Sequence, residues 1–339
     1  MPKWSARDGI DRGDSCDVRD RPLRRGDRVE VRSAAEVLAT LDERAELESV
    51  PFMPEMVALC GKQFTVLATA DRVCDTIHWS GARSMPCTVL LDDLRCDGSG
   101  HSGCAAECRL YWKEAWLRRA GAGAPPAPVA PGPDASAELM ERARLNSVTV
   151  DAEGAERYRC QATQAFEASV QLSPKDPRSY VRQWTNGNVS LPHFARVMCH
   201  AVAVETARNL GRSSEPSVKG HGPSSPRLPT LGLQPGDWVR VKSRSEIEAT
   251  LNENGKNRGL WFDREMLRFC GEVLQVRQRV TKLVDDQTGR LIELSSDCVT
   301  LDGAVCSGEN SPGRWFCPRA IFPYWREGWL EPADPPGPQ

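Results

Sequence analysis

The feature that most constrains how this chain folds is an internal repeat. GDRVEVRSAAEVLATLDERAELESVPFMPEMVALCG, which begins at Gly26, and GDWVRVKSRSEIEATLNENGKNRGLWFDREMLRFCG, which begins at Gly236, match at a constant offset of 210 residues. Three residues inserted near the end of the second copy shift the offset to 213. A register held over this length predicts two homologous modules, at 24–119 and 234–332. The identical pairs include Val29/Val239, Cys60/Cys270, Cys96/Cys306, Cys104/Cys317, Trp112/Trp325 and Trp116/Trp329.

Each module is predicted to be mainly β. Valines alternate with charged residues after the opening Gly-Asp pair of each copy, which is the pattern of a half-buried strand. Ser33 and Ser243 stand where they can cap a short helical turn, and VDDQTGRLIEL predicts a hairpin that turns at 286–289. YWKEAWL and YWREGWL are predicted to be terminal strands whose tryptophans fill a small core. The fold class is therefore mainly β with an α-helical insert, and each module is expected to be a small SH3-like β-barrel.

The segment between the modules is predicted to be helical. Residues 155–172 have helical spacing, and SLPHFARVMCHAVAVETARNLG predicts a longer helix that Ser190 caps and Gly211 ends. The predicted order outside the two barrels is a flexible N-terminus (1–23), a Pro/Ala linker (120–134), a helical domain (135–212), a flexible linker (213–233) and a flexible tail (333–339).

Charge and hydropathy exclude several classes of protein. Lys and Arg number 44 against 46 Asp and Glu, so the net charge of −2 provides no general attraction to nucleic acid or to an anionic membrane. No apolar run approaches the roughly 20 residues that span a bilayer, and the N-terminus lacks an apolar signal core. We therefore expect a cytoplasmic protein, in which the 13 cysteines are metal ligands or buried thiols rather than a disulfide framework.

The cysteines of the first module predict a metal site. Cys96, Cys104 and Cys108 lie in one loop rich in Gly, Ser and Asp, with His101 as a weaker candidate inside it, and Cys60 is expected to approach across the barrel. Four thiolates would form a closed tetrahedral zinc site. Iron or an iron–sulfur cluster is the alternative for soft thiolate ligands, and buried packing thiols are the alternative without metal.

The second module has one cysteine fewer. Cys270, Cys306 and Cys317 are weaker candidates, because Ile321 replaces the fourth cysteine of the loop. Three interpretations follow: a metal site with an open position, a site completed by another domain, or core cysteines without metal. The last is preferred.

Three further groups of residues are considered. Cys160, in YRCQAT, is the candidate catalytic residue, as a nucleophile or as a ligand donated to a barrel. Glu55, which is repeated at position 265, stands where it can accept a hydrogen bond from a metal ligand or support a turn. His193 and His200 can flank a ligand on one helix, although ordinary helix histidines are the simpler interpretation. The remaining thiols, expected to be packing or surface residues, are Cys16, Cys74, Cys87, Cys199 and Cys298.

The motifs MVALCG, LRCDGSGHSGCAAECRLYWKEAWL, YRCQAT, EMLRFCG and WFCPRAIFPYWREGWL resemble a family of uncharacterised bacterial proteins. Members of that family pair two cysteine-bearing modules around a helical segment, and some are encoded in biosynthetic gene regions. The resemblance implies this architecture and a bacterial setting, and it implies no particular reaction.

The leading hypothesis is a zinc-binding accessory or interaction protein of a bacterial biosynthetic pathway, which would bind a protein partner or a small molecule. The alternative is a metal- or thiol-dependent enzyme whose site lies where the first barrel meets the helical domain, at Cys160. A third hypothesis, a nucleic-acid-binding barrel protein, is disfavoured by the near-neutral charge.

Overall fold

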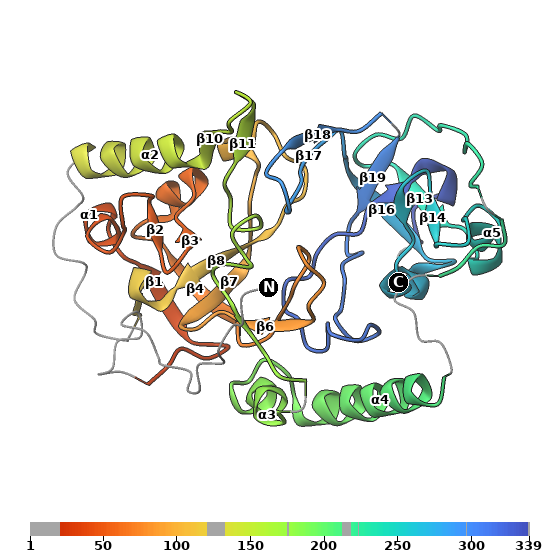
Figure 1. The fold of residues 1–339 in the computed structure, drawn as a ribbon, viewed down its shortest axis with the longest axis horizontal. Coiled ribbons are helices and arrows are strands. Elements are labelled where there is room, and N and C mark those ends of the chain that lie inside the picture. Colours follow the sequence, from red (N-terminus) through yellow and green to blue (C-terminus); the bar gives the residue numbers. More distant parts are fainter. Residues whose placement is uncertain are drawn as a thin grey trace.

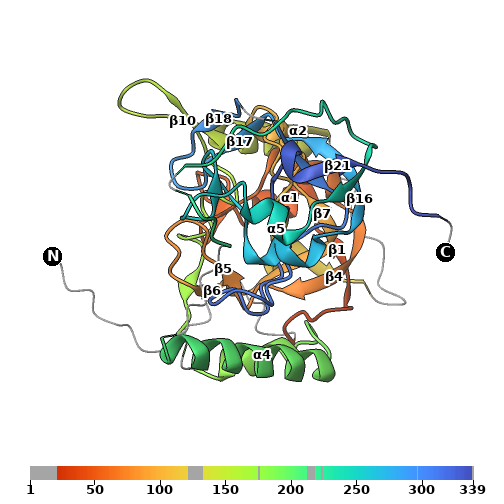
Figure 2. The same ribbon diagram turned by 90° about the vertical axis from the view of Figure 1, so that its right-hand side faces the viewer.

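The computed structural model describes residues 21–120, 133–174, 176–211, 218–222, 224–295 and 297–337. Most of the predicted flexible N-terminus and of the Pro/Ala linker lies outside these ranges, as does the start of the second linker. The chain is mostly β-sheet with several helices, and its two repeat halves lie side by side (Figure 1). The longest helix, α4 (Leu191–Asn209), lies along the lower edge of the molecule in Figures 1 and 2 and packs on the second half.

Each half is built on a curled five-stranded antiparallel sheet. The first has the order β8-β7-β4-β1-β9 and the second the order β20-β19-β16-β13-β21. The first-sheet strands are β1 (Arg28–Val31), β4 (Gln63–Thr69), β7 (Thr88–Arg95), β8 (Arg109–Lys113) and β9 (Leu117–Arg119). The second-sheet strands are β13 (Trp238–Val241), β16 (Val273–Arg279), β19 (Cys298–Leu301), β20 (Trp325–Arg326) and β21 (Leu330–Pro332).

The two sheets have the same register at the offset read from the sequence. Val29 pairs with Phe64 in the first sheet, and the equivalent Val239 pairs with Leu274 in the second. Both sheets also shift register at the same place, between Val66 and Ala68 and between Val276 and Gln278. The repeated sequences therefore specify the same pairings twice, including the irregularity that bends the sheet.

Short helices and hairpins complete each half. Ser33 and Ser243 form capping boxes with Glu36 and Glu246 at the starts of α1 (Ala34–Leu38) and α5 (Arg244–Glu248), as their positions predicted. The 3₁₀ helices are η1 (Pro54–Leu59), η2 (Ser99–His101), η3 (Glu114–Trp116), η4 (Arg264–Phe269) and η5 (Glu327–Trp329). The short strands are β2 (Glu46–Leu47), β3 (Val50–Pro51), β5 (Val73–Cys74), β6 (Ala82–Ser84), β14 (Lys256–Asn257) and β15 (Leu260–Trp261).

Tryptophans fill the centre of each half, as predicted. Trp112 and Trp116 are fully buried, and Phe52 contacts both rings edge-on. The prediction of one continuous terminal strand is wrong, because η3 separates β8 from β9. This turn directs Trp116 inward, where its indole Nε1 donates to Thr40 Oγ1 at 3.0 Å. The same arrangement recurs around Trp325 and Trp329.

The segment between the halves is only partly helical. The elements there are α2 (Pro133–Ser147), β10 (Val148–Val150), β11 (Glu156–Tyr158), β12 (Val170–Gln171), α3 (Arg178–Thr185) and α4. The predicted helix with Ser190 as its N-cap is confirmed as α4, and Gly211 follows it with a φ of +72°.

The helix predicted at 155–172 is wrong, because the chain there forms β11, a series of turns and β12. Gln161 explains the turns. Its side-chain oxygen accepts from Tyr111 N at 2.7 Å, and its amide nitrogen donates to Tyr111 O and Pro51 O, both at 2.9 Å. The buried Gln161 side chain thus makes the hydrogen bonds to β8 that a neighbouring strand would otherwise make.

Equivalent segments of the two halves pack against each other reciprocally where the halves meet. The hairpin of β17 (Lys282–Val284) and β18 (Leu291–Glu293), which confirms the turn predicted at 286–289, packs on the cysteine loop of the first half. The turn after β5 packs in return on the cysteine loop of the second half. Thr76 Oγ1 donates to Asp286 Oδ2 at 2.7 Å, and these two residues occupy equivalent positions of the repeat. The halves therefore meet about an approximate twofold relation.

Candidate functional site

A small cavity of about 30 Å³ lies where the first half meets the β17–β18 hairpin. Its lining combines cysteine, histidine and carboxylate side chains from four separate segments of the chain. A space of this size admits a water molecule or a single ion. The chemically functional residues that line it are Glu55, Cys96, His101, Cys104, Cys108, Cys160 and Asp286.

Cys96 and His101 lie together at one side of the cavity. Cys96 Sγ is 3.3 Å from His101 Nε2 and also accepts the backbone N–H of Gly98 at 3.3 Å. The His101 side chain is 3% exposed, and its Nδ1 has no partner among the described residues. Burial lowers the pKa of His101 in spite of nearby Asp97, so the imidazole is neutral and can act as a ligand at neutral pH.

Glu55 carries an unpaired carboxylate at the same side. Neither carboxylate oxygen has a nitrogen or oxygen partner within the described chain, although the weak S–H donor of Cys96 lies beside it. Burial raises the pKa of Glu55, and the neighbouring Asp97 raises it further. A buried acceptor left without a partner costs about 1–3 kcal/mol, so a cation or a proton at this place would be stabilising.

The second half provides an internal comparison for Glu55. The equivalent Glu265 accepts from Ser307 Oγ at 2.7 Å, from Asn310 N at 2.8 Å and from Asn310 Nδ2 at 3.2 Å. Gly100 occupies the position of Asn310 in the first half, and a Cβ added there would lie 3.2 Å from Glu55 Oε2. The first half thus keeps the carboxylate but lacks the side chains that satisfy it in the second half.

Of the other three thiols of the cavity, Cys104 and Cys160 are buried and Cys108 is partly buried. Burial raises the pKa of Cys108 to about 12 and that of Cys160 to about 11, and it also raises the pKa of Cys104. Cys108 raises the pKa of Cys96, and Cys160 and Cys104 raise the pKa of Cys108, so the four thiols influence one another. Without a bound cation these thiols are protonated, and a metal ion at the cavity would favour their thiolate forms.

Cys60 does not line this cavity. It caps the C-terminal end of η1, whereas Glu55 lies near the start of the same helix, and five residues of 3₁₀ helix span roughly 10 Å. Cys160, which the sequence analysis treats separately from the loop cysteines, lines the cavity instead. As the side chains stand, no three His, Cys, Asp or Glu residues of the described ranges form a group that could hold a metal ion.

The cysteines of the second half are arranged differently. Cys270 ends η4 as Cys60 ends η1. Cys317 accepts the backbone N–H of Cys74, which comes from the first half, at 3.2 Å. Cys306 is partly buried; burial raises its pKa to about 12, and Glu265 and Cys74 raise it further. A thiol of the other half, Cys74, therefore lies beside Cys317.

The remaining predicted residues lie apart from the cavity. Cys298 is buried, Cys199 is exposed, and Cys16 lies outside the described residues. The expectation of a packing or surface thiol is wrong for Cys87, which is disulfide-bonded.

The two helix histidines contact different residues of the second half. His193 Nε2 lies 3.1 Å from a Glu309 carboxylate oxygen, and the His200 ring stands edge-on to Trp315 at 5.8 Å between centroids. Both histidines dock α4 on the second half, which favours the simpler interpretation of these residues.

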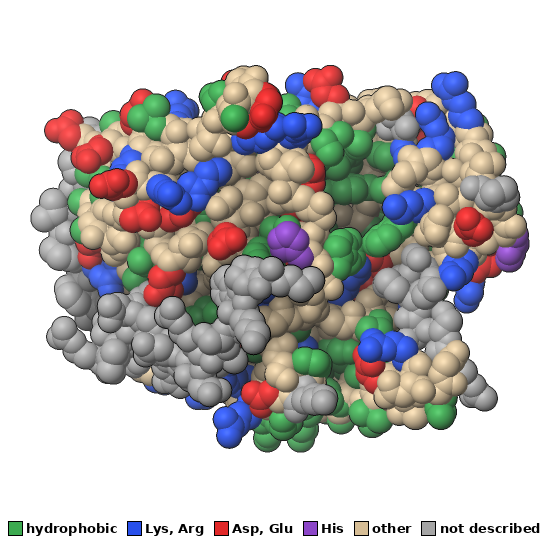
Figure 3. Space-filling model, viewed as in Figure 1, with side chains coloured by type: hydrophobic (Ala, Val, Ile, Leu, Met, Phe, Trp, Pro, Cys, Tyr) green, Lys and Arg blue, Asp and Glu red, His purple; other side chains and the backbone are tan. Residues whose placement is uncertain are grey.

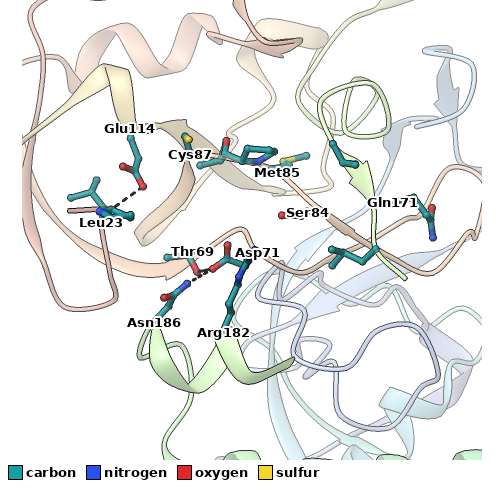
Figure 4. A pocket seen from close by; sticks show the side chains of 15 residues that line it. Leu23, Thr69, Asp71, Ser84, Met85, Cys87, Glu114, Gln171, Arg182 and Asn186 are labelled. Atoms are coloured by element: carbon teal, nitrogen blue, oxygen red, sulfur yellow. Dashed lines mark hydrogen bonds between the residues drawn. The ribbon is translucent and has the colours of Figure 1, made fainter. Parts of the chain in front are cut away.

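A separate cleft of about 200 Å³ lies beside β6 and α3 (Figure 4). Asp71 accepts hydrogen bonds there from Thr69 Oγ1 and Asn186 Nδ2, both at 2.5 Å. Glu114 accepts from Leu23 N at 3.2 Å, and burial raises its pKa. Among the described residues, the lining contains a single cysteine, Cys87, which is disulfide-bonded and has no free thiol to act as a ligand.

No protein family, curated protein or solved structure matches this chain. Among the described residues, none of the helices is long and apolar enough to cross a membrane.

Proposed function

We propose that the chain is a metal-binding protein and that the cavity of the first half takes up one zinc ion. The ligands in this proposal are Cys96, Cys104, Cys108 and Cys160. His101 and Glu55 stand beside Cys96 and support its charge. Cys160 thus replaces Cys60 in the ligand set predicted from the sequence.

The observation that carries the proposal is the contrast between equivalent carboxylates. Glu265 is fully hydrogen-bonded, whereas Glu55 lies beside the Cys96 thiol and has no stronger donor from another described residue. A neutral Glu55 carboxyl group can donate its proton to a thiolate at Cys96, which is the role of a residue that supports a metal ligand. A divalent cation among these four thiols also offsets the cost of ionising them.

Metal binding in this proposal requires a small movement. The thiols surround the cavity, but their present rotamers do not converge on one point. Rotation about χ1 of a cysteine moves its sulfur without moving the backbone. The loop backbone is compatible with close approach of its sulfurs, since Cys96 N donates to Cys108 O at 2.8 Å.

The test is a titration of the reduced full-length chain with zinc and with cobalt. We expect one zinc ion per chain and, with cobalt, the absorption bands of tetrahedral thiolate coordination. Cys108→Ser and Cys160→Ser should each weaken binding by at least tenfold. Cys298→Ser is the matched control, because Cys298 is buried outside the cavity and its loss should leave binding unchanged.

Two outcomes would contradict the proposal. One is a reduced protein that takes up no zinc and gives no thiolate bands with cobalt. The other is equal loss of binding in Cys108→Ser and Cys298→Ser, which would indicate general damage to the fold rather than removal of a ligand.

An interaction role agrees better with these thiols than thiol catalysis does. Burial raises the pKa of Cys160 to about 11, so this residue lacks the stabilised thiolate that a nucleophile needs. On the face shown in Figure 3, acidic and basic side chains are interspersed among the described residues, which gives no support to a nucleic-acid-binding surface. The accessory role in a bacterial biosynthetic pathway, with a protein or small-molecule partner, stays a prediction.

We also infer that each curled sheet belongs to an SH3-like barrel. The first strand of each sheet pairs with both the second and the last, and a 3₁₀ turn separates the last two strands. This order brings the ends of the repeat together around the buried tryptophans. The helical segment between the barrels would then act as a brace, since α2 packs on the first half and α4 on the second.

A further inference from the structure

A second pair of thiols joins the two halves of the molecule. Cys74 ends β5 in the first half and Cys317 lies in the cysteine loop of the second. The backbone N–H of Cys74 donates to Cys317 Sγ at 3.2 Å, and each of the two thiols shifts the pKa of the other. Both residues are buried, with 6% and 7% of their surfaces exposed.

From this contact we propose that Cys74 and Cys317 form a redox-active dithiol that closes to a disulfide between the two halves. A disulfide requires two sulfurs to approach to about 2 Å with their Cβ atoms about 4 Å apart. Cys317 Sγ lies in contact with the backbone of residue 74, so the two side chains start from neighbouring positions, and rotation about χ1 moves each sulfur without moving the backbone. This site is distinct from the proposed zinc cavity, which neither Cys74 nor Cys317 lines.

An arginine supports the reactive form of the pair. Arg319 Nη1 donates to Cys74 O at 3.0 Å, donates to Thr76 Oγ1 at 3.1 Å and lies 3.9 Å from Cys74 Sγ. Arg319 is 6% exposed, and burial acts to lower its pKa, but its interactions with Tyr111, Cys74 and Cys317 outweigh burial and raise the pKa, so the group stays charged.

Hydrogen bonding to Cys317 lowers the pKa of Cys74 to about 6 against the effect of burial, and Arg319 and Arg314 lower it further. Burial raises the pKa of Cys317, as does its hydrogen bond to Cys74. The pair is therefore a thiolate beside a thiol, which is the arrangement that a two-step oxidation needs.

The repeat again supplies a comparison. Val284 occupies the position of Cys74 in the second half, and its N–H donates to Cys104 Sγ at 3.3 Å. The same N–H···Sγ contact therefore occurs twice in the molecule, but the residue that donates the N–H is a cysteine only at position 74. Replacing Val284 by cysteine would provide a second thiol at the equivalent position, next to Cys104.

Hydrogen peroxide is the oxidant for which the step is written. The Cys74 thiolate attacks one peroxide oxygen, which gives a sulfenic acid and releases hydroxide. The Cys317 thiol then attacks the sulfenic sulfur, the S–S bond forms, and water leaves. The proton of Cys317 and one solvent proton are consumed in forming two waters, while two electrons pass from the sulfurs to the peroxide. Hydrogen peroxide is close to water in size and can reach the buried pair, whereas a bulkier disulfide reagent can reach it only after the halves separate.

The experiment is peptide mapping of the full-length chain after treatment with hydrogen peroxide and alkylation of the remaining thiols. We expect a peptide pair linked through Cys74 and Cys317, with two hydrogens fewer than the separate peptides. Cys298 should stay alkylatable. It is the matched buried thiol, because Arg326 Nη1 donates to it at 3.2 Å and no second thiol is among the groups that shift its pKa.

Variants separate the steps. In Cys317→Ser, Cys74 should stop at the sulfenic acid, which a cyclic diketone probe captures. In Val284→Cys, a second link should form between position 284 and Cys104. Recovery of Cys74 and Cys317 only as separate alkylated peptides from the oxidised wild-type chain would overturn the proposal, whether or not the variants fold. The link between Cys74 and Cys317 uses none of the proposed zinc ligands, so its formation is independent of zinc binding. The link in Val284→Cys uses Cys104, a proposed ligand, and is therefore measured in the zinc-free protein.

Discussion

Glu55 and Glu265 are the same residue of the repeat in two different environments. Substituting glutamine keeps the size of each side chain and removes its charge. We expect Glu265→Gln to lower the free energy of unfolding by about 1–2 kcal/mol, because the new amide nitrogen faces the N–H donors of Asn310. Glu55→Gln should cause no loss in the metal-free protein, since no polar partner is removed. Urea unfolding of both variants measures the difference, and equal destabilisation would contradict it.

The sequence predicted part of the candidate site at the scale of single residues. The loop spacing of Cys96, Cys104 and Cys108 placed these three thiols together, because a short loop keeps its members close. The fourth member was not predictable in this way. Cys60 and Cys160 are both distant in sequence from the loop, and only the fold decides which of them reaches the cavity. The pairing of Cys74 with Cys317 depends in the same way on how the halves dock.

The elements were most predictable where the pattern is local. Strand alternation and the turn residues gave the hairpin of β17 and β18, and the N-cap serine gave the start of α4. The helix expected at 155–172 failed for a non-local reason. Gln161 bonds to the backbone of β8 and β3, and these bonds hold the segment in turns although its apolar spacing is helical.

Cys74 ends β5, and the turn that follows this strand is stabilised by hydrogen bonds to the Asp75 carboxylate. This carboxylate accepts bonds from Ile77 N, His78 N, Ser80 N and Ser80 Oγ. Burial acts to raise the pKa of Asp75, but the bonds from Ser80, His78 and Ile77 outweigh it and lower the pKa to about 2. The ionised carboxylate therefore stabilises the turn.

We expect Asp75→Asn to lower the free energy of unfolding by about 1–2 kcal/mol above about pH 5. Because the pKa of Asp75 is lower in the folded than in the unfolded chain, its stabilisation is lost as the pH falls through 3.8 toward 2. The gap between wild type and variant should therefore close in that interval. Urea titrations between about pH 2 and pH 7 measure it, with Asp42→Asn, another carboxylate that accepts turn N–H groups, as control. A gap that widens toward acid would contradict this account.

At the scale of the whole molecule, the two halves and the segment between them share buried contacts. Arg72 is the clearest case, since it is 2% exposed and reaches all three parts. Its Nε donates to Trp315 O of the second half at 3.2 Å, and its Nη1 donates to Ser179 Oγ of α3 at 2.7 Å. The guanidinium group also lies 3.9 Å from the centre of the Tyr180 ring. A single side chain from the first half thus holds α3 and the second half in place.

These contacts imply that the chain unfolds as one cooperative unit, which Arg72→Lys should disrupt. A lysine keeps the charge, but it cannot donate in two directions while stacking on Tyr180. We expect a loss of about 2–3 kcal/mol, because hydrogen bonds from a charged group are removed and a buried charge loses partners. Calorimetry should show one transition for the wild type and a broadened or divided one for the variant. Arg32→Lys is the control, because Arg32 bonds only within the first half, to Leu117 O and Glu36. If Arg72→Lys unfolds in one sharp transition at the wild-type temperature, the halves are not coupled through this residue.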